Sequence, residues 1–177
     1  MTARTQHLTL SAMFMALGIV IPYFFHAVGL GSMFLPMFWP VAVAAFFLPI
    51  PYAAAVGALT PFLSFLVSGM PPPPTLYRMI FELVALGGSI SYLHRSTRYG
   101  LFWITLVGLV ISRGAGWLGA LAIAPILGLP PEFYALISLS VGVPGMVVMM
   151  VIIPFILKRL KSDDTLFRRR SSVVESA

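Results

Sequence analysis

Hydrophobic residues fill the chain in long runs, and short polar or turn-forming segments separate these runs. A helix needs roughly 20 apolar residues to cross the hydrocarbon of a bilayer. Six runs come close to or exceed that length: 8–25, 34–49, 52–68, 75–94, 100–124 and 133–158. Glycine and proline mark most of the breaks, as such residues do in turns. The pattern predicts an all-α integral membrane protein with six transmembrane helices.

The composition agrees with a bilayer as the solvent. Of the 177 residues, 59% are hydrophobic and only 9% are charged, whereas a soluble domain carries about 25% charge. We therefore predict a six-helix transmembrane domain over 1–160 and a polar, basic tail over 161–177.

Basic residues indicate how the helices are oriented. Of the eleven Lys and Arg residues, all but Arg78 and Arg113 fall in segments that share one side of a six-helix topology. Cytoplasmic segments of membrane proteins are enriched in Lys and Arg, so both termini are predicted to be cytoplasmic. The net charge of +6 then reflects membrane anchoring, and no nucleic-acid partner is expected.

Signatures of enzymes and metal sites are weak or missing. The chain has no cysteine, which excludes disulfides and thiolate ligands. His26 ends the first run without a second histidine at metal-ligand spacing. No phosphate-binding loop and no nucleophile motif is found. We expect a protein that is not an enzyme and that carries no metal or cofactor.

Ionisable residues inside apolar runs are costly, and they usually face a protein interior or a watery cavity. Arg78 and Glu82 are four residues apart, a spacing that allows pairing on one helix face. Arg113 lies in the next run, where Gly114 and Gly116 would permit close approach. A Glu82–Arg113 pair is therefore predicted. It can either lock two helices together or anchor a bound ligand, and the sequence leaves both open.

Aromatic residues gather towards the predicted outer side of the membrane. They can form the aromatic belt at the interface, or some can line a pocket that stacks a ring-containing ligand. The set comprises Phe24, Phe25, Phe34, Phe38, Trp39, Tyr77, Phe133 and Tyr134.

Several segments together resemble the substrate-binding S components of energy-coupling factor (ECF) vitamin transporters. The likeness covers most of 8–157. It rests on the order of Leu35-Pro36-Met37, Thr60-Pro61, Gly69-Met70-Pro71-Pro72 and Glu82, together with the segments LSAMFMALGIVIPYFFHAVGLG near the N-terminus and SVGVPGMVVMMVIIPFIL near the C-terminus.

The resemblance implies a high-affinity binding subunit of an ABC-type importer in a bacterial cell membrane. Such a subunit captures a vitamin or related micronutrient from outside, and a membrane coupling subunit with two ATPase subunits delivers it inward. The loops Gly29–Met33 and Gly69–Pro74 would help to cover the ligand. Ala12 and Ala16 correspond to the small-residue motif that docks the coupling subunit, and small residues four apart do allow close helix approach.

The predicted substrate-binding residues are Glu82, Arg78, Arg113, Phe38, Trp39, Met37, His26, Met70 and Tyr77. One departure concerns Phe38, because sequences of this type often carry a histidine after Leu-Pro-Met. The four prolines Pro71–Pro74 are expected either to stiffen a ligand-gating loop or to form a plain rigid turn.

Two other functions compete with the importer subunit. The chain can be a self-sufficient secondary carrier or channel that uses Glu82 as a proton site. It can also be a structural membrane protein whose polar residues only join helices. Release of a small molecule from the purified protein would separate a binder from a scaffold.

Overall fold

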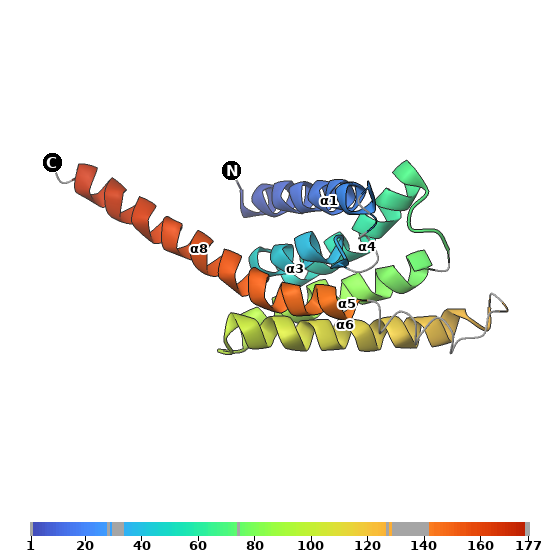
Figure 1. Cartoon of the computed structure of the whole chain (residues 1–177). Helices are drawn as coiled ribbons and strands as arrows, with labels where there is room; N and C mark the ends of the chain where they lie inside the picture. The colour runs from blue at the N-terminus through green and yellow to red at the C-terminus, as the bar shows by residue number, and fades with distance from the viewer. Residues whose placement is uncertain are drawn as a thin grey trace.

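The computed structural model of the protein describes residues 2–27, 29, 34–73, 75–126, 128 and 142–175, and it omits the side chains of 26, 27 and 160–175. Over these ranges the protein is all-helical. The helices are α1 (Ala3–Ala27), α3 (Phe38–Phe47), α4 (Ile50–Ser68), α5 (Thr75–Ser96), α6 (Leu101–Ile123) and α8 (Val143–Glu175). They run lengthwise beside one another as a bundle, from which the C-terminal part of α8 projects (Figure 1).

Four helices in the described part of the chain are long and apolar enough to cross a membrane: α1 over 3–25, α4, α5 and α6. The bounds of α4, α5 and α6 match the predicted runs to within two residues. The protein therefore has the character of a membrane protein. The sixth predicted run, 133–158, falls in part outside the described residues, and the helix that follows begins at Val143 and continues to Glu175.

The predicted second span is the main departure from the sequence expectation. The run 34–49 holds only the ten-residue helix α3, which is about 15 Å long and covers roughly half of the hydrocarbon thickness. A turn precedes this helix, because Leu35 adopts a left-handed φ of 50° before Pro36. Pro49 ends it by holding Leu48 in an extended conformation. Apolar composition alone therefore overestimates the length of this helix.

The start of α1 lies at the end of the bundle where α5 passes to α6, and α8 leaves the bundle towards the same side (Figure 1). Exposed basic side chains occur at the start of α1 (Arg4), at the end of α5 and just after it (Arg95 and Arg98), and midway along α8 (Lys158 and Arg159). This arrangement agrees with termini on one side of a membrane. The six-span topology and the cytoplasmic placement of the termini stay predictions.

Glycines set the spacing between α4 and α5. A Cβ atom on Gly57 would overlap the backbone of Leu83, and one on Gly87 would overlap the carbonyl of Ala53. The two helices thus contact each other backbone to backbone at two points, as small residues allow in membrane bundles. This contact fixes the position of α5 and of the charged residues in its first half.

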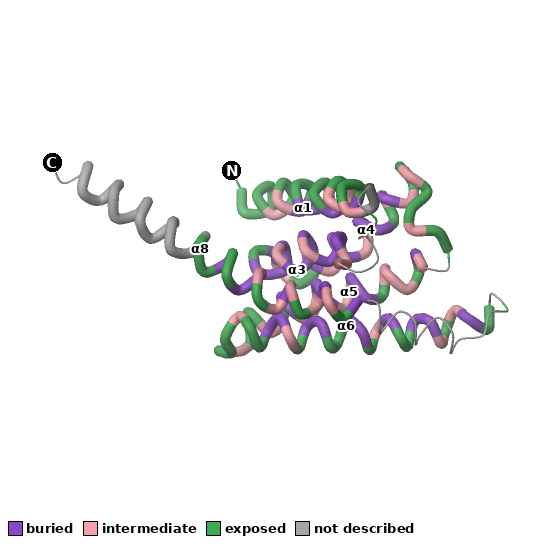
Figure 2. Tube along the Cα trace, viewed as in Figure 1, coloured by how far each residue is buried: buried purple, intermediate pink, exposed green. Residues whose placement is uncertain are grey.

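The short helix α3 occupies the centre of the bundle, packed against α1, α4, α5 and α8. Its side chains at Phe38, Val41, Ala42, Ala44 and Ala45 are almost completely buried. Figure 2 shows buried positions along the facing sides of the helices and exposed ones on the outside, most of all on α1. The exposed outer positions are largely apolar, as expected where the surroundings are lipid tails.

Candidate functional site

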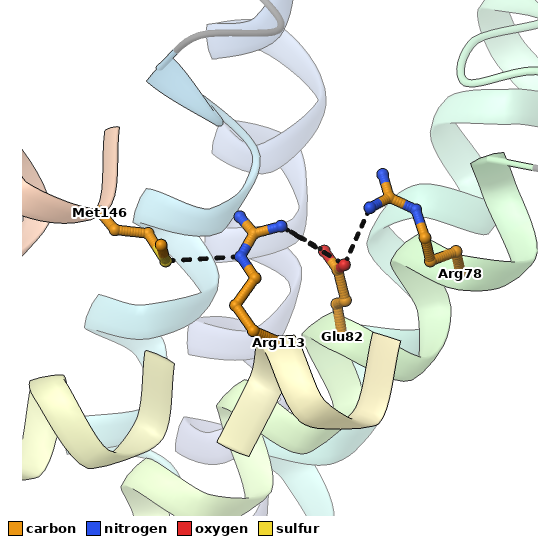
Figure 3. A network of polar contacts seen from close by, with 4 residues as sticks. All are labelled: Arg78, Glu82, Arg113 and Met146. Carbon is orange, nitrogen blue, oxygen red and sulfur yellow. Dashed lines mark hydrogen bonds and ion pairs between the residues drawn. The ribbon is translucent and has the colours of Figure 1, made fainter. Parts of the chain in front are cut away.

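Three charged residues meet in the first half of α5 and the middle of α6. Arg78 Nη1 donates to Glu82 Oε1 at 3.1 Å, and Arg113 Nη1 lies 3.3 Å from Glu82 Oε2 and 3.4 Å from Oε1. Figure 3 shows the carboxylate between the two guanidinium groups. The predicted Glu82–Arg113 pair is therefore confirmed, and Arg78 joins it. We call these residues the Arg–Glu–Arg cluster.

Helix geometry and one glycine bring the cluster together. Arg78 and Glu82 share a face of α5 because they are four residues apart. On α6, a Cβ atom at Gly116 would overlap the side chain of Glu82, whereas one at Gly114 would meet nothing within 4 Å. Of the two glycines expected to permit close approach, Gly116 alone does so, and Gly114 faces outward.

The cluster is buried well inside the bundle. Glu82 is 2% exposed and Arg113 is 7% exposed, while the side chain of Arg78 is 18% exposed. Glu82 lies seven residues from the start of α5, about 10 Å along the helix. Buried charges are tolerated in such surroundings only when they are paired. Glu82 faces the interior of the bundle.

Arg113 contacts α3 and α8 as well as α5. Its Nε donates to the Met146 sulfur at 3.4 Å, and its guanidinium carbon lies 5.2 Å from the centre of the Phe38 ring. A guanidinium group over an aromatic face is stabilised by the ring quadrupole. Phe38 thus supports the arginine by a cation–π contact. It stands where the resemblance to S components predicts a histidine.

The cluster carries unused binding capacity. Two arginines and one glutamate sum to a charge of +1, and Arg113 Nη2 is buried without a hydrogen-bond partner among the described residues. An unpaired buried donor costs free energy unless something accepts its hydrogen bond. Among the described residues, no group of His, Asp or Glu could hold a metal ion. The arrangement is suited to binding an acceptor or an anion.

The other predicted site residues fall into two groups. Met37 is buried beside Phe38 at the start of α3. Trp39 is half-buried, and its indole N–H donates to the Phe34 carbonyl at 2.9 Å. Met70 and Tyr77 are exposed, and among the described residues neither makes a polar contact with the cluster. The side chain of His26 lies outside the described part.

The loop that enters α5 is ordered by local contacts over its described residues. Gly69 ends α4 in a left-handed conformation, with φ 71°, and its N–H donates to the Phe65 carbonyl. The Ser68 hydroxyl accepts from the Met70 N–H at 3.2 Å. The predicted ligand-covering segments Gly29–Met33 and Gly69–Pro74 fall partly outside the described residues, so their role stays a prediction.

Ala12 and Ala16 lie on the outward face of α1. Both are exposed, whereas Phe14 and Gly18 face the bundle, where a Cβ atom on Gly18 would approach the Thr60 methyl group at 2.5 Å. The two alanines therefore do not pack against the described part of the chain. Their role in docking a coupling subunit stays a prediction.

Sequence reasoning missed two residues that adjoin Arg113. Met146 accepts from its Nε, and a Cβ atom on Gly142 would lie 2.8 Å from its Nη2. Gly142 lies just before α8 and Met146 lies in its first turn, within the segment Gly-Val-Pro-Gly-Met. The Pro in the first turn of that segment is a helix-start signal. It marks where α8 begins, but no sequence signal shows that this end reaches Arg113.

The chain matches no protein-family model, no curated protein and no solved structure.

Proposed function

We propose that the protein is the substrate-binding membrane subunit of an energy-coupling factor importer for a vitamin or related micronutrient. The observation that carries the proposal is the buried Arg–Glu–Arg cluster. It lies inside an apolar helical bundle, and its Arg113 Nη2 has no hydrogen-bond partner among the described residues. An ionisable residue inside a membrane segment is by default a candidate functional site. The resemblance of the ordered segments along 8–157 to the S components points the same way.

The position of the cluster favours capture of the ligand from outside the cell. It lies about 10 Å from the start of α5, on the side of the segment Gly69–Pro74. The exposed basic residues belong to the opposite end of the bundle, which the bias of basic residues assigns to the cytoplasm. In this proposal the ligand enters from the proline-rich side, and the protein resides in a bacterial cell membrane.

Transport would depend on partner subunits. The chain has no phosphate-binding loop, so ATP hydrolysis is assigned to two ATPase subunits joined through a membrane coupling subunit. The exposed Ala12 and Ala16 offer a flat strip on α1 for that coupling subunit, because small side chains allow helices to approach closely. The protein itself is proposed to bind ligand without chemical conversion.

A self-sufficient proton-coupled carrier fits the site less well. Its proton site would have to exchange protons with solvent during each cycle. Glu82 is 2% exposed, and arginine donors engage both of its oxygens. A purely structural cluster would explain the two ion pairs, but it leaves Arg113 Nη2 buried and without a partner over the described ranges.

Mass spectrometry of small molecules released from the purified protein tests the binding role. The protein is purified from bacterial membranes in mild detergent, denatured, and compared with an unrelated membrane protein prepared in the same way. We expect one organic molecule in near-equal molar amount. A folded protein that releases none, even after growth on rich medium, would instead support a structural role.

Co-purification with the coupling subunit and ATPases of the same genome tests the partners. Ala12→Leu together with Ala16→Leu should abolish the complex, because the larger side chains keep the helices apart. Ligand binding should remain. The matched control is Val20→Leu, at another exposed position of α1. A complex that still forms with leucine at both positions would contradict the assignment of the Ala12–Ala16 surface to the coupling subunit.

A further inference from the structure

Arg113 lies along the first turn of α8 and touches it at two points. Its Nε donates to Met146 Sδ at 3.4 Å, and its Nη2 comes close enough to Gly142 that an added Cβ atom would sit 2.8 Å away. The Met146 N–H donates to the Gly142 carbonyl at 3.1 Å, which makes Gly142 the residue where the α8 hydrogen-bond ladder begins. The free edge of the guanidinium group therefore faces the start of a long helix.

The start of α8 is itself a cluster of donors. The first N–H groups of any helix have no acceptor within the helix, and here they belong to Gly142, Val143 and Gly145, because Pro144 has none. The aligned peptide dipoles add partial positive charge at this end. Helix starts are accordingly frequent binding sites for phosphate and carboxylate groups.

Two positive features thus face each other across a short distance. Glu82 compensates the guanidinium group only on its Nη1 side, and the Phe38 ring lies over its face. The Nη2 side is buried, adjoins the helix start and has no hydrogen-bond partner in the part of the chain that the structure describes. Arg113 as a whole is 7% exposed, so bulk water does not solvate the excess charge. A single negative charge at this point would satisfy both features.

We propose that Arg113 Nη2 and the first turn of α8 bind one oxyanion group, a carboxylate or a phosphate, of the imported molecule. The proposal rests on the importer function proposed above and narrows its substrate to organic anions. The net charge of +1 on the Arg–Glu–Arg cluster matches a group with one negative charge. Arg78, the most accessible member, is placed to attract the anion before it reaches Arg113.

Three probes of similar shape test this assignment on the full-length protein in detergent. Benzoate and phenyl phosphate carry the proposed group, while benzamide is a neutral analogue of benzoate. A ligand that binds only the folded state raises the melting temperature according to its concentration and affinity. At equal ionic strength, both anions should raise it by several degrees and benzamide should leave it unchanged. Equal shifts with benzoate and benzamide would overturn the proposal.

Replacing Arg113 with glutamine should weaken benzoate binding by roughly 10- to 100-fold, the range expected for losing a charged hydrogen bond. Because this variant can fail to fold, a second pair is placed at Gly142. Gly142→Asp would bring a tethered carboxylate towards Nη2, and Gly142→Asn would supply a similar helix cap without charge. In both variants the new Cβ atom would lie 2.9 Å from Leu35 Cδ1, which must shift, so the two differ in charge alone. The Asp variant should melt higher than the Asn variant and lose its response to benzoate.

Two results at Gly142 would count against the site. One is an Asp variant that melts no higher than the Asn variant. The other is an Asp variant that responds to benzoate as fully as the unmodified protein. Inorganic phosphate serves as a further arm, because stabilisation by free phosphate without any effect of benzoate or phenyl phosphate would contradict an organic ligand.

The released molecule separates this inference from the function on which it rests. If a molecule is released in stoichiometric amount and it is neutral, the oxyanion site is wrong and the importer subunit stands. If benzoate binds through Arg113 but no molecule is released and no complex with a coupling subunit forms, the oxyanion site stands and the importer function is wrong.

Discussion

Removing the charge of Glu82 should destabilise the protein more than any other single change in the cluster. In Glu82→Gln, the shape of the side chain is kept while Arg78 and Arg113 both lose their anionic partner. Breaking a buried ion pair by deleting one partner costs about 3–5 kcal/mol. Glu82 is 2% exposed and joins two pairs, so we expect a value in that range.

The companion change Arg113→Met should cost less, about 1–3 kcal/mol. Glu82 then keeps its bond to Arg78 at 3.1 Å. The methionine side chain would pack between Phe38 and Met146, which already contact the arginine. Replacement of buried ions by apolar groups of similar volume is often well tolerated. The double variant Glu82→Gln with Arg113→Met should therefore be more stable than the sum of the two single effects predicts, by about 1–3 kcal/mol.

The assay is reversible unfolding in detergent micelles, followed by circular dichroism for all four proteins of the cycle. For a chain of this length, 3–5 kcal/mol corresponds to a fall in melting temperature of about 6–20 °C. Arg98→Gln, at an exposed position after α5, serves as the control and should change stability by less than about 0.5 kcal/mol. If Glu82→Gln is as stable as Arg98→Gln, the carboxylate does not hold the two arginines, and the reasoning fails.

Three further predictions concern packing, topology and the entry loop. Gly116→Ala should destabilise the protein by about 1–3 kcal/mol, because its Cβ atom overlaps Glu82. Gly114→Ala should stabilise it by up to about 1 kcal/mol through helix propensity; equal effects in thermal unfolding would contradict the close contact. Because the chain has no cysteine, Met70→Cys and Tyr99→Cys each introduce a unique label site at an exposed position. In intact cells a membrane-impermeant maleimide should label position 70 alone, and labelling of position 99 would reverse the topology. Replacing Pro71–Pro74 with glycine and serine should weaken binding of the released ligand, because a flexible loop must be ordered on closure; unchanged affinity in a titration would discard the gating role.

Much of the helical layout follows from the sequence because a bilayer limits the choices. In lipid, the backbone of apolar runs such as 52–68 and 75–94 can satisfy its hydrogen bonds only as a helix. The Glu82–Arg113 pair was accessible for the same reason, since an isolated carboxylate in such a run demands a cation nearby. The neighbouring run 34–49 shows the limit of this logic. Its turn at Leu35–Met37 depends on packing around α3, and apolar composition does not reveal that packing.

The surroundings of the pair could not be read from the chain. Phe38 on α3, Met146 on α8 and Gly142 just before α8 approach Arg113, and their spacing along the sequence carries no sign of this. Tyr77 is different. It lies one residue before Arg78, and a helix turns by about 100° per residue, so its position on another face was accessible from periodicity. The indole N–H of Trp39 donates to the Phe34 carbonyl. This contact forms only after the chain has turned at Leu35–Met37.

The most direct test of the Arg–Glu–Arg cluster as a ligand site uses a variant that removes the ion pair but keeps the bundle packed. Glu82→Leu with Arg113→Met replaces both buried charges by apolar side chains of similar size, which buried pairs often tolerate. Arg78 also loses its partner in this variant, but its side chain is 18% exposed. The measurement is the molar amount of organic molecule released per mole of folded protein, beside the unmodified protein. We predict near-equal molar release from the unmodified protein and almost none from the double variant. Equal release from both would show that the ligand binds elsewhere.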